Sequence, residues 1–384
     1  MKTRNSGSAA HIVILCLCWY LISSLGSQVT KSILTIYPKP LFLGEFQFIY
    51  TAFLAAICCF IAHRCKMFYR WFPRGTFPLY YEDETREKRQ IKTLTRPTKH
   101  ILLTVLPLSF FQFVGKYFGH TATSLVPVST VASIKTLSPV FILIFQRLLN
   151  VQRTNMSGLI YFSLACLIMG VWIIVGEDNA QRTNDSKKSQ INPIGLSSYG
   201  VLCAVSSMLI FVAQNIYGKN VFTLRREGSS EKQDLARDGS PLPIFVEKKT
   251  TMSCPKSYDK LTLLIYIPLV GFCLSFLWFI NLELPSIWTD VKENGMAIIP
   301  WKLLLLNGTF HFMQAMITFH LMGEVSTLTY SIANLMKRIA IITVSWAFSG
   351  ANVNIKQVIG LILNMIGLFF YERHNSKNKP AKLH

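Results

Sequence analysis

Charged residues are scarce in this chain. They make up 15% of its 384 residues, whereas a soluble domain usually carries about 25%. Apolar residues make up 51%, and no stretch is long and mixed enough in composition to fold in water as a large catalytic domain. The mean hydropathy of +0.36 excludes a chain that is disordered throughout. The composition instead allows about nine or ten membrane-spanning helices of about 20 residues each.

The sequence also lacks the motifs of ATP-driven pumps and of metal-dependent enzymes. It contains no Walker loop, no HExxH motif and no paired-carboxylate arrangement. Its nine cysteines show neither zinc-ligand spacing nor the pattern of a secreted disulfide framework, and most lie inside apolar runs. We interpret them as small apolar packing residues. We therefore expect no enzymatic activity, no metal and no cofactor.

Acidic residues are half as frequent as basic ones, 19 against 39, which gives a net charge of +20. Such a balance often indicates nucleic-acid binding, but here the basic residues are divided among loops between hydrophobic runs. We therefore exclude nucleic acid as a partner. Residues 63–99 hold ten lysines and arginines against four acids, and residues 218–260 hold nine against six. The positive-inside rule predicts this excess for cytosolic loops of a membrane protein.

Ten hydrophobic segments predict an all-α polytopic membrane protein with about ten transmembrane helices in a lipid bilayer. The segments are residues 11–36, 41–62, 100–120, 122–147, 156–176, 194–217, 260–281, 298–322, 325–349 and 355–371. With ten spans, both termini and every basic loop fall on the cytosolic side. Four prolines inside these segments, among them Pro139, are candidates for helix bends.

The segments divide into two sets of five, which predicts two inverted five-helix repeats. The first repeat covers residues 1–176, a lumenal connector covers 177–193, and the second repeat covers 194–384 with a mobile cytosolic loop over 225–259. Val128-Ser129-Thr130 and Val325-Ser326-Thr327 occupy equivalent places in the two halves. Asn184 matches a glycosylation acceptor in the predicted connector.

Three basic residues lie near the middle of predicted spans, where a charge is expensive and usually functional. They are Lys135 in the fourth span and Lys337 and Arg338 in the ninth. Glu45 is the one acid well inside a predicted span, and it lies near an end. A buried cation satisfied by backbone carbonyls is one interpretation of these charges. The other is an anion site in a water-accessible cavity, because arginine presents a planar fork to phosphate oxygens and lysine a compact charge.

Further polar residues are candidates for the lining of such a cavity. Lys116 lies in the third span, closer to its non-cytosolic end, and it either contacts an anion or extends to the interface. The neutral candidates are Thr136, Asn334, Gln314 and Tyr330.

Two segments resemble motifs of the triose-phosphate translocator family. They are Val126-Pro127-Val128-Ser129-Thr130 with Ile134-Lys135-Thr136-Leu137-Ser138-Pro139, and Tyr330-Ser331-Ile332-Ala333-Asn334-Leu335-Met336-Lys337-Arg338-Ile339. This resemblance implies ten helices in two inverted repeats, with phosphate held at the positions of Lys135, Lys337 and Arg338. Lys116 stands where the family has histidine, and Gln314 where it has tyrosine. The sequence is most similar to a fungal branch of the early secretory pathway, which implies the endoplasmic reticulum or the Golgi.

These observations predict a secondary-active antiporter that exchanges a phosphorylated small organic anion or inorganic phosphate across an endomembrane. A nucleotide-sugar antiporter is the first alternative. A non-transporting membrane protein that binds partners through its long loops is the second, although a scaffold gains nothing from central cations. The sequence leaves the oligomeric state open.

Overall fold

The computed structural model describes residues 6–72, 76–78, 94, 97, 99–148, 158–186, 197–214, 217, 259–325, 327–350 and 353–377. Within these ranges the protein is all-helical and has no β-strand. Seven helical stretches among the described residues are long and apolar enough to cross a membrane, with residues 128–145 counted as one, which fits the predicted polytopic membrane protein. The predicted loop over 225–259 lies outside the described residues except for Asp259.

The helices follow the predicted hydrophobic segments closely. The first half contains α1 (Ser6–Ile36), α2 (Pro40–Arg64), α3 (Lys66–Trp71), α4 (Lys99–Leu125), α5 (Val128–Thr136), α6 (Ser138–Leu148) and α7 (Gly158–Ser186). The second half contains the helix Ser197–Gln214, α9 (Lys260–Leu282), α10 (Leu284–Asn294), α11 (Trp301–Glu324), α12 (Thr327–Ser349) and α13 (Ile355–Lys377). Large apolar side chains such as Leu103, Trp172 and Leu277 are exposed on the outer faces, as a protein that contacts lipid requires.

Helices from the two halves of the chain pack against one another. The extensive contacts are those of α7 with α13, α2 with α9, α1 with α11 and α12, and α5 with α12. The contact of α7 with α13 depends on glycine, because a Cβ atom at Gly170 would lie 2.6 Å from the carbonyl oxygen of Gly360. Small residues permit such close approach of two backbones in a membrane interface.

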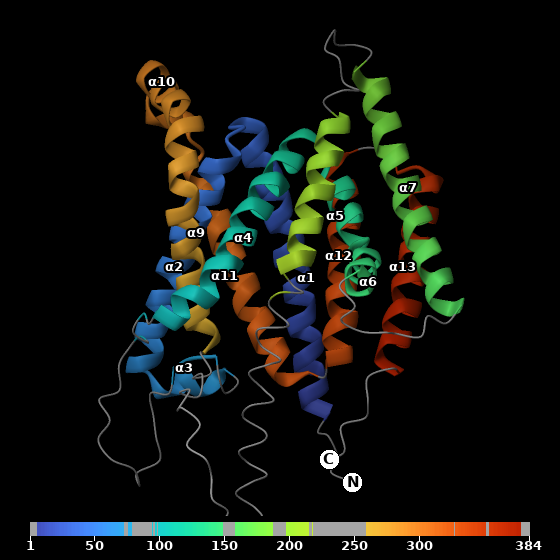
Figure 1. Cartoon of the computed structure of the whole chain (residues 1–384), viewed down its shortest axis with the longest axis horizontal. Helices are drawn as coiled ribbons and strands as arrows, with labels where there is room; N and C mark the ends of the chain where they lie inside the picture. Colours follow the sequence, from blue (N-terminus) through green and yellow to red (C-terminus); the bar gives the residue numbers. More distant parts are fainter. Residues whose placement is uncertain are drawn as a thin grey trace, which may run out of the picture.

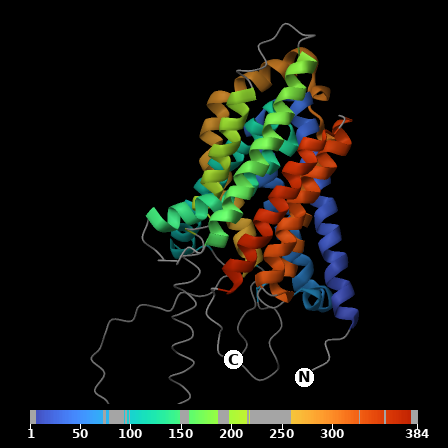
Figure 2. The same ribbon diagram turned by 90° about the vertical axis from the view of Figure 1, so that its right-hand side faces the viewer.

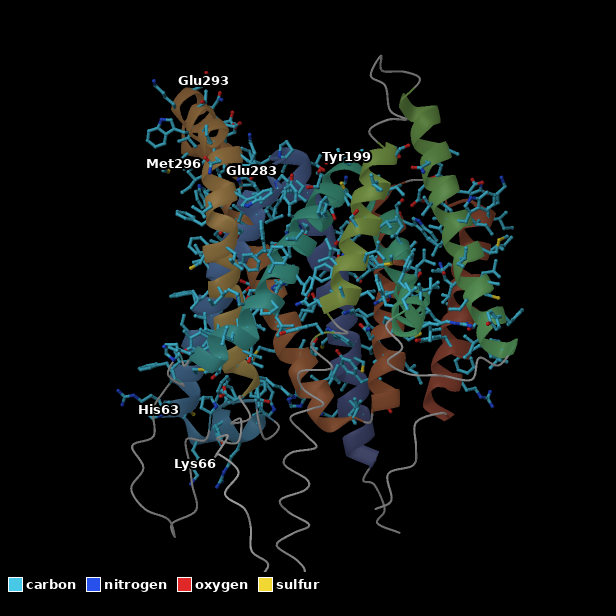
Figure 3. The ribbon with its side chains drawn as sticks, in the orientation of Figure 1. His63, Lys66, Tyr199, Glu283, Glu293 and Met296 are labelled. Atoms are coloured by element: carbon cyan, nitrogen blue, oxygen red, sulfur yellow. The ribbon has the colours of Figure 1, made fainter. Side chains whose placement is uncertain are left out.

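The first turn of α1 and the last turn of α13 lie at the same end of the bundle as α3, and α10 lies at the opposite end (Figures 1 and 2). His63 and Lys66 mark the first of these ends, where α2 passes into α3, and Glu283 and Glu293 mark the second (Figure 3). Lys66 therefore lies at one end of the bundle and the two glutamates at the other.

Two details of the predicted boundaries are wrong. Residues 122–125 belong to α4 and not to the fourth span, and the predicted fourth span is two helices that meet at Leu137. Pro139 explains the break, because proline has no N–H for the carbonyl oxygen of Lys135 four residues earlier. The expected bend at this proline is thus confirmed as an interruption of the helix.

The segment predicted to begin the lumenal connector continues α7 as far as Ser186. Asp178 in this extension is buried and accepts hydrogen bonds from the hydroxyls of Ser129 and Thr130 and from the side-chain amide of Gln357, each at 2.7 Å. The repeated Val-Ser-Thr motif therefore fixes the start of α5 against α7 and α13. Asn184 lies in the last turn of α7, and its side chain lies outside the described part of the structure.

Helix α10 occupies part of a predicted loop, and Glu283 at its start joins it to α2. The Glu283 carboxylate accepts hydrogen bonds from the backbone N–H groups of Leu41 at 2.9 Å and Phe42 at 2.7 Å. It thereby satisfies two free donors at the N-terminus of α2, where a negative charge is favourable. Burial raises the pKa of this carboxyl group, and the two N–H donors oppose the shift.

Candidate functional site

A cavity of about 420 Å³ lies between the two halves of the chain. Its lining comes from α1, α2, α4, α5 and α6 of the first half of the chain and from the helix Ser197–Gln214, α11 and α12 of the second half. Six of the predicted site residues line it: Lys116, Lys135, Gln314, Asn334, Lys337 and Arg338. The described residues of the lining include no aspartate or glutamate, so four cations face a cavity without an acid.

Arg338 of α12 reaches across to the break between α5 and α6. Its Nη1 donates hydrogen bonds to the carbonyl oxygen of Lys135 and, at 3.0 Å, to the hydroxyl of Ser138. The first of these acceptors is the carbonyl that Pro139 leaves without its helical N–H. A charged donor thus stabilises the break, and the break places Lys135 beside Arg338.

The ammonium groups of Lys337 and Lys135 lie over aromatic rings. Lys337 Nζ is 4.3 Å from the centre of the Trp19 ring, and Lys135 Nζ is 6.0 Å from that of Phe211. A ring face attracts a cation by about 0.5–2 kcal/mol, which is weaker than an ion pair in a dry site. These lysines are therefore held in place by groups that an entering anion can outcompete.

Lys116 begins a chain of hydrogen bonds on the other side of the cavity. Its Nζ donates to Gln47 Oε1 at 3.2 Å and lies 4.5 Å from the centre of the Phe48 ring. The Gln47 amide donates to Asn307 Oδ1 at 2.7 Å, and the Asn307 amide donates to the Thr30 hydroxyl at 2.7 Å. The network connects α4, α2, α11 and α1, so the position of Lys116 depends on four helices.

Two predicted site residues do not line the cavity. Thr136 is buried and donates to the carbonyl oxygen of Ser133 at 2.6 Å and to Asn364 Oδ1 of α13 at 3.4 Å. Tyr330 stacks on Trp19, with ring centres 5.8 Å apart. It therefore contacts the ring over which the Lys337 ammonium group lies and acts on the site through that ring.

Sequence reasoning missed Gln47 and Asn307. Both are almost completely buried polar residues in the middle of apolar helices. A polar side chain inside a hydrophobic segment was the available signal. Lys31, near the end of α1, donates hydrogen bonds to the carbonyl oxygens of Thr123, Ser124 and Val126 at 2.8–3.2 Å. It caps the C-terminus of α4, where a cation is favourable.

The arrangement has the chemistry of an anion site. Lysine ammonium groups and an arginine guanidinium surround a cavity large enough for a small organic phosphate, and amide groups supply neutral donors beside them. Among the described residues no cluster of three or more metal-ligating side chains occurs.

The Triose-phosphate Transporter family matches residues 10–236 and 244–372 of the chain. The chain is 56% identical to a Saccharomyces cerevisiae protein named uncharacterized transporter YJL193W, over 96% of this chain and 95% of that protein. It is 34% identical to uncharacterized transporter SLY41 of the same yeast, over 97% of this chain and 82% of that protein. It is 21% identical to the xylulose 5-phosphate/phosphate translocator of Arabidopsis thaliana chloroplasts, over 100% of this chain and 74% of that protein.

Proposed function

Because this chain belongs to the Triose-phosphate Transporter family, we propose that it is a secondary-active antiporter. It exchanges a phosphorylated small organic anion or inorganic phosphate across an endomembrane, the endoplasmic reticulum or the Golgi. The observation that carries the proposal is the cavity with four basic side chains and no acid in its described lining. The relative from chloroplasts is named for xylulose 5-phosphate and phosphate, which supports this class of substrate.

Lys135, Lys337 and Arg338 hold the phosphate group in this proposal, and Asn334 and Gln314 contribute neutral contacts. The three cations come from α5 and α12, one helix from each half of the chain. A bound phosphate therefore joins the two halves, and a movement of one half against the other carries it across the membrane. Thr136 acts indirectly through its contact with α13, and Tyr330 acts indirectly through Trp19.

Exchange follows from the energetics of the empty cavity. Without an anion the cations repel one another in a low-dielectric environment, with ring faces and carbonyl oxygens as their partners. Closing the cavity empty costs more than closing it around a phosphate. The protein consequently returns with a second anion bound, which is antiport.

The proposed architecture is ten membrane-spanning helices in two inverted five-helix repeats, residues 1–176 and 194–384, around a short connector. It is supported by the contacts of α2 with α9, of the α5 segment with α12, and of α7 with α13. Each of these pairs joins a predicted span to the span five places later. The basic residues of α3 lie at the same end as the first turn of α1 and the last turn of α13 (Figures 1 and 3), which supports cytosolic termini.

The test is reconstitution of the full chain into liposomes preloaded with phosphate, followed by uptake of labelled phosphate and competition by a panel of solutes. We expect uptake only into preloaded liposomes and competition by phosphorylated organic anions. The exposed Lys292 of α10 lies outside the cavity, so Lys292→Ala is a matched control for the loss of one cation. Uptake that requires no internal anion would refute antiport, and competition by nucleotide sugars alone would favour the alternative substrate class.

A further inference from the structure

A second, much smaller cavity lies behind Lys116, on the side away from the large cavity. Its volume is about 10 Å³, and Glu45, Lys116, Tyr117 and Ser275 contribute its polar groups. Lys116 lines both cavities. Its side chain therefore stands between the anion site and a carboxyl group.

Glu45 is an unusual residue for this position in a membrane protein. It lies in the second turn of α2 with 5% of its surface exposed, and neither carboxylate oxygen accepts a hydrogen bond from a described residue. The Ser275 hydroxyl lines the same cavity and is close enough to interact with the carboxyl group, but it donates to the carbonyl oxygen of Gly271 at 2.8 Å. An ionised carboxylate without donors is strongly disfavoured in such a place.

The protein contains a contrasting carboxylate that is equally buried. Asp178 also has 5% of its surface exposed, but it accepts three hydrogen bonds of 2.7 Å. Its charge is therefore stabilised by donors. Glu45 has a nearby charge instead, the ammonium group of Lys116, with which it interacts electrostatically.

The other ionisable groups around Glu45 do not provide a second partner. α4 contributes Tyr117 besides Lys116, and the end of α9 contributes Glu283, a like charge already bound to two N–H groups of α2. α11 contributes His311, which is within hydrogen-bond distance of Thr51 at 3.4 Å. α3 carries Lys66 and Arg70 at the opposite end of α2.

We propose that Glu45 is a proton-binding site that controls whether Lys116 is available to an anion in the large cavity. When Glu45 is ionised, its charge offsets that of Lys116, and the pair adds no net charge to the site. When Glu45 takes up a proton from the aqueous solution, it becomes a neutral carboxylic acid and leaves Lys116 as an uncompensated cation. The site then favours a more negatively charged substrate, which enters together with that proton.

The small cavity limits the ligand to a proton. A volume of about 10 Å³ is close to the minimum for one water molecule and excludes any organic solute. A metal cation needs several oxygen ligands, and the adjacent ammonium group opposes its binding.

Infrared spectroscopy of the full chain tests the site without any transport. A protonated carboxylic acid gives a C=O stretching band that an ionised carboxylate lacks. We expect a band that titrates with pH in the wild type, is lost in Glu45→Gln and is retained in the matched control Asp178→Asn. In Lys116→Met the band should persist to a pH higher by about one unit or more, because the favourable charge is gone. A spectrum of Glu45→Gln identical to that of the wild type at every pH would overturn the proposal.

Phosphate exchange in liposomes tests the consequence for the anion site, and this part rests on the proposed function. Glu45→Gln mimics the protonated state, so we expect it to match the wild type at acidic pH. As the pH rises, the exchange rate of the wild type should decrease to about one tenth or less of the rate of Glu45→Gln. This is the effect of one charge in a desolvated site. Phosphate itself titrates in this pH range, but this changes both rates equally and leaves their ratio unaffected.

The two experiments separate failure of the proposed function from failure of this inference. If the wild type exchanges no phosphate at any pH, the proposed function fails, and the infrared titration still decides the role of Glu45. If exchange occurs and the ratio of the two rates is constant with pH, Glu45 does not control the site and the inference is refuted.

Discussion

Replacement of Arg338 by lysine keeps the charge of the cavity and removes the planar guanidinium group. In the structure Nη1 of Arg338 serves two acceptors on α5–α6, the carbonyl oxygen of Lys135 and the Ser138 hydroxyl. Lysine has one nitrogen on a flexible stem, and it cannot hold this pair of acceptors and a phosphate group at the same time. We therefore expect Arg338→Lys to lose both substrate affinity and stability.

The magnitude follows from the contacts that are lost. A hydrogen bond to a charged group contributes about 1.5–3 kcal/mol, and each 1.4 kcal/mol corresponds to a factor of about ten in affinity. Loss of one such bond to the substrate therefore weakens phosphate binding by about 10- to 100-fold. Loss of a bond to the α5–α6 break lowers the free energy of unfolding by a similar amount.

Substitution of Pro139 separates the two effects. In Pro139→Ala the new N–H at position 139 can donate to the carbonyl oxygen of Lys135, so the α5–α6 break no longer needs Arg338. In the Pro139→Ala background, Arg338→Lys should lower the free energy of unfolding by less than it does in the wild type. It should weaken phosphate binding by the same factor in both. Thermal unfolding in detergent and competition for labelled phosphate in liposomes measure the two quantities. Wild-type affinity in Arg338→Lys would show that the arginine is structural, and our assignment of its role would be wrong.

Four further predictions concern the other cations, the helix packing and the topology. Lys135→Ala and Lys337→Ala should each abolish exchange, because each loses about 2–5 kcal/mol of substrate binding. The melting temperature of each variant should stay near that of Lys292→Ala. Normal exchange in either variant would show that the replaced lysine is not part of the site. Lys116→His should reduce competition by solutes with two anionic groups more than uptake of inorganic phosphate, and equal losses for all competitors would contradict this. Gly360→Leu should destabilise the protein by about 1–3 kcal/mol, because its Cβ would lie 2.9 Å from the carbonyl oxygen of Gly170; an unchanged melting temperature would show that α7 and α13 separate freely. Both termini should be accessible to protease from the cytosolic side, and Asn184 should be reached by the glycosylation machinery of the lumen; a C-terminal tag that is protected from cytosolic protease would refute ten spans.

The central cations were found from the sequence because their cost does not depend on the details of packing. A lysine or arginine in the middle of an apolar segment is expensive in any arrangement of helices. Lys135, Lys337 and Arg338 stood out for this reason, and the structure brings all three to one cavity. Their binding of phosphate stays a prediction.

The indirect positions of Thr136 and Tyr330 were not accessible to the same reasoning. Both are close in sequence to the cations, but the side of a helix that faces the cavity depends on its rotation and on where it is broken. The break at Leu137 turns Thr136 toward Asn364 of α13, and the stacking of Tyr330 on Trp19 depends on α1. Contacts between residues far apart in the sequence determine both.

The order of residues along the chain was enough to predict a polytopic membrane protein, the approximate extent of its helices and the charges that are costly in a membrane. These follow from hydropathy and from the energy of a charge in a bilayer, which are local properties of the chain. The packing of the helices determined which polar groups meet: Arg338 with the carbonyl released by Pro139, Lys116 with Gln47, and Glu45 with the small cavity that Lys116 also lines. Each of these depends on how helices from different parts of the chain pack, and packing is a property of the whole set of contacts that no single segment contains.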